Sequence, residues 1–227
     1  MKAIIFDCDG TLVDSETLST EVLVEAVSEH GLELTVPEAL TAFRGGKMAD
    51  CIAELEVRLG RPLPAAFVPE FRARSAEAFR SRLRAIDGAL ELVQSLSMLP
   101  VPFCVASSGP MAKIELSLTL TGLLPFFEGR IFSSYDVGAW KPDPGLFLHA
   151  ANALGVAPGD CAVIEDSLPG MLAGLAAGMT VFSFQPHGVD PRTPAETLPL
   201  TKLLDLRARL AASAPEPGDR SISRRAT

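Results

Sequence analysis

The sequence has little of what several common kinds of active site require. Its 227 residues include only 3 histidines and 4 cysteines. No two cysteines form a C-x-x-C pair, so no zinc site is indicated, and a disulfide framework is not expected at this length. His30, His149 and His187 have no plausible nucleophile or metal ligand beside them. A reaction would therefore depend mainly on carboxylates and lysine, and the isolated cysteines favour a reducing, cytoplasmic setting.

Long apolar runs and a surplus of positive charge are absent as well. No stretch reaches the ~18 apolar residues that a membrane helix needs. The first residues run into Asp7 after four apolar ones, so no secretory signal is expected. The formal net charge is −8, from 20 basic and 28 acidic residues, whereas nucleic-acid-binding proteins normally carry a basic surplus. We therefore expect neither a membrane nor a nucleic acid as a partner.

Apolar residues nevertheless make up 48% of the chain, which is enough for a hydrophobic core. Five short apolar runs predict parallel strands buried on both faces, at residues 3–6, 101–106, 130–133, 161–164 and 180–184. Helical patterns lie between the later strands, at residues 89–97, 111–120, 145–154 and 168–177. This alternation predicts an α/β fold with a doubly wound, Rossmann-like parallel sheet.

The first two predicted strands are unusually far apart. About 95 residues separate them, where a complete βαβ unit takes only ~30. Apolar residues at helical spacing predict helices at residues 16–30, 48–59 and 64–83, the first with Ser15 as its N-cap and Gly31 as its stop. We therefore expect a helical cap domain at residues 16–84, inserted into a catalytic core of residues 1–15 and 85–213. Residues 214–227 lack periodicity and are expected to form a disordered tail.

Polar residues follow four of the predicted strands in turn. They are Asp7 and Asp9, then Ser107, Ser108 and Gly109, then Lys141 in a proline-rich loop, and finally Glu165 and Asp166. The carboxyl ends of parallel strands meet at the edge where open α/β sheets bind ligands. Each group alone has a structural interpretation, as a turn, a helix cap or a surface charge. Their convergence on one edge favours a functional site.

The chemistry of this set is that of phosphoryl transfer. Two pairs of carboxylates repel one another unless a hard cation lies between them, and Mg²⁺ suits one or two carboxylates together with a phosphate. The turn at Ser107, Ser108 and Gly109 offers a hydroxyl and backbone N–H groups to an anion. Lys141 adds positive charge for the remaining phosphoryl oxygens. The predicted partner is a small phosphorylated molecule.

Four ordered motifs resemble those of the haloacid dehalogenase superfamily, over residues 1 to about 210. They are Asp7-x-Asp9-Gly10-Thr11, Ser107-x-Gly109, Lys141-Pro142-Asp143-Pro144 and Glu165-Asp166-Ser167. The helical insertion is similar to the cap of the β-phosphoglucomutase and phosphoglycolate phosphatase branch. Residues 43–47 and 135–142 are similar to a bacterial subgroup of sugar-phosphate phosphatases that includes 6-phosphogluconate phosphatase.

The resemblance implies a role for each residue of the rim. Asp7 is the expected nucleophile and forms an aspartyl-phosphate, while Asp9 protonates the leaving group and then deprotonates the water. Ser107 and Lys141 are expected to hold the phosphoryl group. The implied Mg²⁺ ligands are the Asp7 carboxylate, the Asp9 backbone carbonyl and Asp166, with Glu165 either touching the metal or supporting its ligands.

Departures from the sibling patterns favour a phosphatase. True dehalogenases lack the second aspartate and the metal, and phosphonatases carry an uncharged residue in the place of Asp9, although Lys47 falls near their cap lysine. Mutases carry a cap histidine where Ser19 lies and an arginine where Met48 lies. A hexose-phosphate mutase stays the first alternative, and a non-catalytic phospho-ligand binder or phosphoacceptor the second.

Substrate selection is expected to lie in the cap. Arg44 and Lys47 flank two glycines and are predicted to bind an anionic part of the substrate, together with Ser108 and Gly109 of the core. The alternative for the two cations is solvation, or pairing with cap acids such as Asp50 and Glu54. The sequence predicts a monomer or a weak homodimer.

Overall fold

The computed structural model describes residues 1–186 and 188–212. The predicted tail at residues 214–227 and His187 lie outside this range. Within it, all four cysteines are buried and free. None of the described helices is long and apolar enough to cross a membrane.

Six parallel strands form one sheet, in the order β3-β2-β1-β4-β5-β6. Their bounds are β1 (Ala3–Phe6), β2 (Phe103–Ser107), β3 (Ile131–Ser133), β4 (Cys161–Glu165), β5 (Thr180–Phe184) and β6 (Leu198–Leu200). The first five correspond to the predicted runs, whereas β6 is a short edge strand that the sequence pattern did not reveal. The predicted fold class, a doubly wound α/β sheet, is confirmed.

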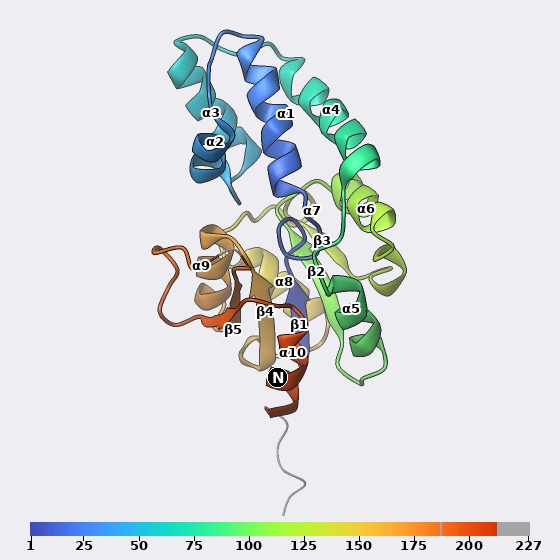
Figure 1. Cartoon of the computed structure of the whole chain (residues 1–227). Coiled ribbons are helices and arrows are strands. Elements are labelled where there is room, and N and C mark those ends of the chain that lie inside the picture. The colour runs from blue at the N-terminus through green and yellow to red at the C-terminus, as the bar shows by residue number, and fades with distance from the viewer. Residues whose placement is uncertain (187, 213–227) are drawn as a thin grey trace, which may run out of the picture.

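Helices cover both faces of the sheet (Figure 1). On β1, Ile4 and Phe6 belong to one apolar core, and Ala3 and Ile5 belong to the other. Alternate residues of a strand point to opposite faces, so a strand buried on both sides is apolar at every position. The first core is shared with α5 (Ala89–Ser97), α6 (Met111–Leu120) and α10 (Asp205–Ala212), and the second with α8 (Gly145–Ala153) and α9 (Leu168–Ala176).

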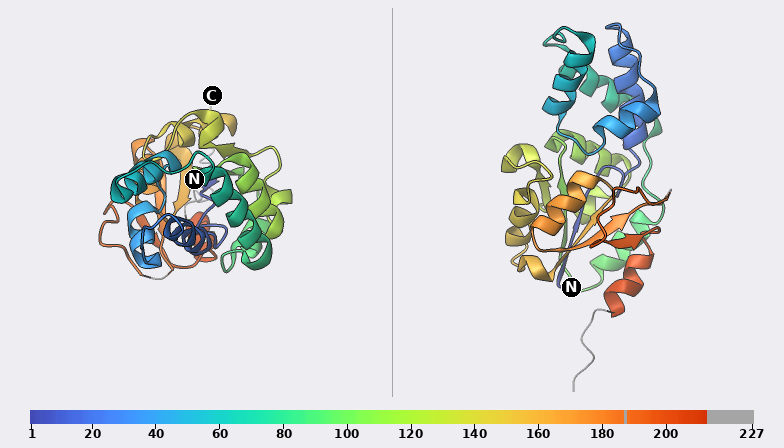
Figure 2. Two further views of the ribbon diagram at one scale, coloured as in Figure 1. Left: turned by 90° about the horizontal axis from the view of Figure 1, so that it is seen from above. Right: turned by 90° about the vertical axis from the view of Figure 1, so that its left-hand side faces the viewer.

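Four further helices lie together beyond the carboxyl ends of the strands (Figure 1; Figure 2, right). They are α1 (Glu16–Ser28), α2 (Val36–Phe43), α3 (Met48–Leu59) and α4 (Phe67–Arg82). Their apolar side chains, among them Val27, Leu55 and Phe71, form a cluster of their own, separate from both cores of the sheet. These helices therefore have their own hydrophobic support and cover the edge where the predicted site lies.

The chain enters and leaves this group of helices through two adjacent segments. The Asp14 N–H donates to the Arg84 carbonyl at 2.9 Å, and the Ile86 N–H donates to the Leu12 carbonyl at 3.0 Å. The crossing thus lies within a few residues of Asp9. Because so few residues connect the two parts, a rotation about them would move all four helices relative to the strand ends.

Candidate active site

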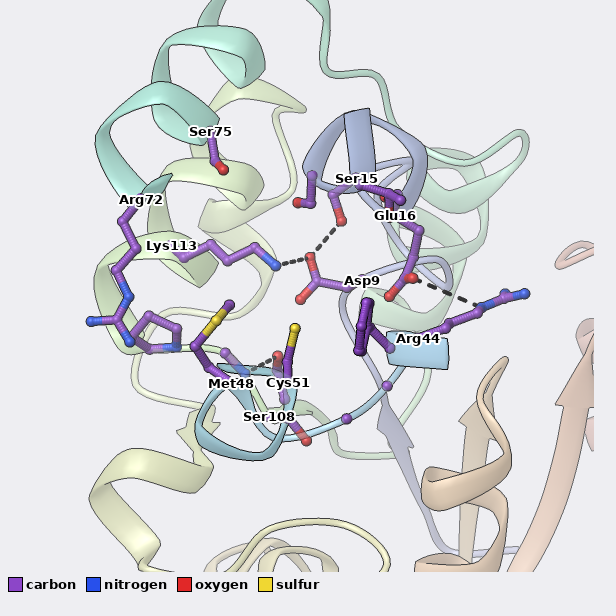
Figure 3. Close-up of a pocket in the computed structure, with 18 of the residues that line it drawn as sticks. Asp9, Ser15, Glu16, Arg44, Met48, Cys51, Arg72, Ser75, Ser108 and Lys113 are labelled. Atoms are coloured by element: carbon purple, nitrogen blue, oxygen red, sulfur yellow. Dashed lines mark hydrogen bonds and ion pairs between the residues drawn. The ribbon is translucent and has the colours of Figure 1, made fainter. Parts of the chain in front are cut away.

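The loops after β1, β2 and β4 line a cavity of about 560 Å³ beneath helices α1–α4 (Figure 3). Nine of the ten predicted site residues line it, namely Asp7, Asp9, Arg44, Ser107, Ser108, Gly109, Lys141, Glu165 and Asp166. The tenth, Lys47, is not among the lining residues. The structure therefore brings the core motifs together at one end of the sheet.

Asp7 directly follows β1 and is buried. The Lys141 ammonium lies 2.5 Å from Asp7 Oδ1 and 2.6 Å from Glu165 Oε1. Burial raises the pKa of Asp7 well above its usual value, although Lys141 acts in the opposite direction. Burial also opposes the charge of Lys141, but the two carboxylates outweigh it and raise the pKa of the lysine. Among the described residues, no side chain donates to Asp7 Oδ2, so this oxygen is free to meet a ligand.

Asp9 is held through one of its oxygens only. Ser15 Oγ donates to Asp9 Oδ1, and Lys113 Nζ lies 2.8 Å from the same atom (Figure 3). Burial works against the ionised form, but Lys113 and the Ser15 hydroxyl outweigh it and lower the pKa of Asp9. The other oxygen faces the turn after β2, since a Cβ placed on Gly109 would lie 3.6 Å from Asp9 Oδ2.

The sequence predicted neither the Ser15–Asp9 nor the Lys113–Asp9 contact. Ser15 stands at the N-cap position of α1, as predicted, but its side chain makes no cap hydrogen bond and its hydroxyl donates to Asp9 instead. Lys113 was missed altogether. One signal was available, since Lys113 stands in the first turn of α6, where the helix dipole disfavours a cation. Its position there is compensated by the Asp9 carboxylate.

Glu165 and Asp166 differ in what occupies their oxygens. Glu165 Oε1 contacts Lys141, and Glu165 Oε2 accepts from the N–H and hydroxyl of Ser167 at 2.8 and 2.9 Å. Asp166 Oδ1 accepts from Thr11 at 3.3 Å, and Asp166 Oδ2 accepts from the Arg44 guanidinium. Both oxygens of Glu165 are therefore engaged by core residues, whereas Asp166 meets a cation from the helical part.

The pKa of Asp166 reflects this crowded setting. Burial and the neighbouring Glu165 charge raise the pKa of Asp166 to about 7, although Arg44 opposes them. Glu16, the first residue of α1, was not predicted to belong to the site but also lines the cavity. Burial and the Asp9 charge raise the pKa of Glu16 to about 7. A hard cation among these groups would favour their ionised forms.

The turn after β2 is held in place by side-chain hydrogen bonds. Ser107 Oγ accepts from the Gly109 N–H at 3.0 Å, and Ser133 Oγ donates to the Gly109 carbonyl at 2.7 Å. The Ser108 hydroxyl is buried and lines the cavity without a partner among the described residues. Buried hydroxyls are normally hydrogen-bonded, so Ser108 has unused capacity for a ligand.

The two predicted cap cations lie in different places. Arg44 reaches the core and contacts Asp166, and the next residue, Gly45, has a φ of +71°, which favours glycine. A Cβ at Gly45 would lie 2.6 Å from Ser167 Cβ, so this loop packs tightly against the core. Lys47 turns away and lies 4.2 Å from the ring centroid of Trp140, a cation–π contact.

The oxygen donors available to a metal are few. Among the residues that the structure describes, no group of three or more His, Cys, Asp or Glu side chains is arranged to hold a metal ion. Asp7 Oδ2 has no side-chain donor among these residues. The other two predicted ligands are the Asp9 backbone carbonyl and the Asp166 carboxylate, whose oxygens accept from Thr11 and Arg44. Mg²⁺ commonly binds through one or two carboxylates and takes its other ligands from water and phosphate. This small, all-oxygen set fits that pattern.

Comparison with known proteins identifies the family of the chain. Residues 1–178 match the family of haloacid dehalogenase-like hydrolases. The chain belongs to this family. The predicted family is therefore confirmed, and the α/β fold described above agrees with it.

Individual relatives agree with this assignment. The chain is 39% identical to 6-phosphogluconate phosphatase of Escherichia coli over 190 residues, which cover 82% of this chain and 85% of the relative. It is 34% identical to hexitol phosphatase A of the same organism over 193 residues, covering 84% and 86% of the two chains. Because the family is one of hydrolases and these relatives are named phosphatases, the predicted enzyme class, a phosphomonoesterase, is confirmed.

A solved structure supports the same conclusion. A haloacid dehalogenase family hydrolase from Deinococcus radiodurans, crystallised with bound phosphate and sodium, is 33% identical to this chain. The two structures align with a TM-score of 0.74 over 93% of this chain and 96% of the other.

Proposed function

We propose that this haloacid dehalogenase family member is a Mg²⁺-dependent phosphatase that hydrolyses a small sugar phosphate through an aspartyl-phosphate on Asp7. The observation that carries the proposal concerns the two aspartates of one loop. Asp7 and Asp9 are each held through Oδ1, by Lys141 and Lys113 respectively. Each Oδ2 is left without a side-chain donor among the described residues. Two carboxylates with one available oxygen each suit a nucleophile and an acid–base group.

Asp7 is proposed as the nucleophile. Its Oδ2 attacks the phosphorus atom, and the bond between phosphorus and the ester oxygen breaks. Lys141 orients the carboxylate through Oδ1 and stabilises negative charge on the phosphoryl group. Glu165 holds Lys141 from the other side at 2.6 Å, and its own second oxygen is fixed by Ser167. The Lys141 ammonium is thus restrained by two carboxylates.

Asp9 is proposed as the acid and then the base. It gives a proton to the leaving alkoxide, and it later takes one from the water that attacks the phosphorus of the aspartyl-phosphate, releasing inorganic phosphate and free Asp7. In the free protein, Lys113 favours the ionised form of Asp9. A phosphate dianion next to Oδ2 favours the protonated form, so substrate binding itself would prepare the acid.

The turn after β2 is proposed to hold the phosphoryl oxygens. Ser107 presents its hydroxyl, and the N–H groups of Ser108 and Gly109 lie at a turn before α6, which is favourable for an anion. The unpartnered Ser108 hydroxyl is a further donor. Ser107, Ser108, Gly109 and Lys141 together would surround the transferred group.

Mg²⁺ is the proposed cofactor, held by Asp7, the Asp9 backbone carbonyl and Asp166. When bound, the metal would supply positive charge that stabilises the phosphoryl oxygens. Glu165 is assigned to supporting this arrangement, because Lys141 and Ser167 of the core hold both of its oxygens, whereas one oxygen of Asp166 is held by Arg44 from the cap.

Residues 16–84 are proposed to act as a cap domain on a core of residues 1–15 and 85–213. The separate apolar cluster of α1–α4 and the paired crossing segments support this division. Opening would admit the substrate, and closing would exclude water from the phosphoryl group before transfer. The Arg44–Asp166 contact joins the cap to the core in the closed arrangement.

The relatives named for 6-phosphogluconate and for hexitol phosphates favour a small sugar phosphate as the substrate. A mutase is disfavoured, because Ser19 lines the cavity at the place where mutases carry their cap histidine. Action in the cytoplasm, as a monomer or a weak homodimer and without a nucleic acid or a membrane as partner, belongs to the same proposal.

A panel of phosphate esters tests the proposed function. We expect steady turnover of p-nitrophenyl phosphate and of several sugar phosphates with Mg²⁺, loss of turnover with a chelator, and recovery when Mg²⁺ is returned. Released phosphate is the measurement. An absence of turnover across the panel would contradict the hydrolase, and conversion between hexose-phosphate isomers without phosphate release would establish the mutase instead.

Substitutions of Arg44 and Lys47 test the predicted role of these cations in substrate binding. Because Arg44 contacts Asp166, we expect Arg44→Ala to lower kcat/KM for 6-phosphogluconate and for a neutral sugar phosphate alike, by about tenfold. Lys47→Ala is expected to change kcat/KM for either substrate by no more than about twofold, since the Lys47 side chain lies on the Trp140 ring. A loss of kcat/KM confined to 6-phosphogluconate would show instead that these residues bind its second anionic group, as the sequence predicts.

A further inference from the structure

One cation of the cavity differs from the others in its partners. The cavity is lined by Arg44, Arg72, Arg80, Lys113 and Lys141. Four of these contact a carboxylate, as the pairs Arg44–Asp166, Arg80–Glu77, Lys113–Asp9 and Lys141–Asp7. Among the described residues, Arg72 has no carboxylate partner. Its charge is therefore available to an anionic ligand.

Arg72 is nevertheless held in place. Its Nη2 donates to the Tyr135 hydroxyl at 3.0 Å, and its guanidinium carbon lies 5.4 Å from the centre of the Tyr135 ring. Tyr135 in turn packs edge-on against Trp140, with 5.6 Å between ring centroids. This neutral support orients the guanidinium without cancelling its charge, and it leaves most of its N–H donors free.

A buried hydroxyl lies one helical turn away from Arg72. Ser75 is only 7% exposed, lines the cavity, and its hydroxyl has no hydrogen-bond partner among the described residues. Arg72 and Ser75 both belong to α4, and residues three apart lie on the same face of a helix. Figure 3 shows them on one side of the cavity, with Asp9 between them and Arg44. In the proposed reaction Asp9 protonates the leaving alcohol oxygen, and Arg72 and Ser75 lie on one side of Asp9 in this view.

We propose that Arg72 and Ser75 form a subsite for a carboxylate on the alcohol part of the phosphate ester, so that the substrate class is that of phosphorylated sugar acids. A planar guanidinium matches the geometry of a carboxylate, and one cation with one hydroxyl balances a single negative charge. A second phosphate would bring more charge than these two groups compensate. The inference rests on the proposed function and names the substrate of that same site.

A matched pair of substrates isolates the carboxylate. 6-Phosphogluconate and glucitol 6-phosphate differ only in a carboxylate against a hydroxymethyl group at the end of the chain remote from the phosphate. We expect the protein to prefer 6-phosphogluconate. Arg72→Ala should lower kcat/KM for 6-phosphogluconate roughly 10- to 100-fold, as expected for the loss of a charge-assisted hydrogen bond. The kcat/KM of the same variant for glucitol 6-phosphate should stay within about threefold of that of the unmodified protein.

Neighbouring variants separate charge reading from damage to the helix. Arg72→Lys should keep part of the preference for 6-phosphogluconate that Arg72→Ala loses. Tyr135→Phe and Ser75→Ala should weaken this preference by smaller factors than Arg72→Ala does. Arg80→Ala is the control, because Arg80 lies on the same helix and is paired with Glu77, and it should leave the ratio between the two substrates unchanged. An equal loss on both substrates in Arg72→Ala, or no preference in the unmodified protein, would overturn the inference.

A binding measurement keeps this inference distinct from the proposed function. In the Asp7→Asn background, calorimetry should show tighter binding of 6-phosphogluconate than of glucitol 6-phosphate, and Arg72→Ala should remove the difference. If binding discriminates but no ester is turned over, the phosphatase proposal fails and the subsite stands. If esters are turned over but neither binding nor kcat/KM discriminates, the subsite fails and the phosphatase stands.

Discussion

Replacing Asp7 with asparagine is expected to abolish turnover, lowering kcat for p-nitrophenyl phosphate by a factor on the order of 10⁴ to 10⁶, as for removal of other catalytic nucleophiles. The amide keeps the shape of the side chain, so the turn after β1 need not move. It is a far weaker nucleophile than the carboxylate, however, and the aspartyl-phosphate, an acyl phosphate, cannot form on it. Phosphate release in the presence of Mg²⁺ is the measurement.

The design needs two controls, because Asp7 also neutralises the buried Lys141. Circular dichroism and thermal unfolding should show a folded Asp7→Asn protein, since Glu165 still accepts from Lys141. Asp160→Asn, which removes a surface partner of Lys2, should keep its activity. A folded Asp7→Asn protein that retained a tenth or more of the activity would exclude Asp7 as the nucleophile.

The parallel sheet could be predicted because burial on both faces leaves a simple pattern. Strand β1 pairs with β4 along its full length, from Ala3 opposite Cys161 to Phe6 opposite Ile164. Every residue of both strands is buried, so each reads as a short apolar run. The positions of Asp7 and Glu165 follow at once, since both lie where a buried run meets the open edge.

Elements with weaker patterns were missed for identifiable reasons. Strand β6 has three residues and contains Pro199, which cannot donate to a ladder and suits only an edge. Helix α2 is short, but it carried a readable signal, because Thr35 and Glu38 form a capping box. The S/T-x-x-E pattern was thus present in the sequence, and the helix was predictable from it.

The side chains of the cavity could be predicted only in part. Residues that follow strands are placed by the sheet, which explains why the core motifs converge. Ser15, Lys113 and Arg72 are placed by how the helices fold back over the sheet, and this information is not in local spacing. A serine at the start of a helix suggests an N-cap hydrogen bond, and an arginine such as Arg72 on α4 suggests a solvated face of the helix. Only the packed structure shows the contacts that they make instead.

Replacing Asp9 with asparagine is expected to separate the two half-reactions. With a sugar phosphate, whose alkoxide needs a proton to leave, the rate should fall roughly 10²- to 10⁴-fold. With p-nitrophenyl phosphate the leaving group needs little help, so the first half-reaction should proceed. Attack of water on the aspartyl-phosphate would then lack its base. The result should be a rapid release of p-nitrophenolate equal to the enzyme concentration, followed by slow turnover.

The contacts of Asp9 supply a matched comparison for this experiment. Lys113→Gln keeps the Asp9 carboxylate and the Ser15 hydrogen bond but removes the ion pair, so it should slow both substrates by a smaller factor and show no burst. Mass spectrometry of Asp9→Asn quenched in acid should find one added phosphoryl group, on the peptide that contains Asp7. Because the Asp9 backbone carbonyl is unchanged, a loss of Mg²⁺ affinity would not explain the burst. Steady turnover of both substrates at the unmodified rate would exclude Asp9 as the acid and base, and the free Oδ2 beside Gly109 would then need another role.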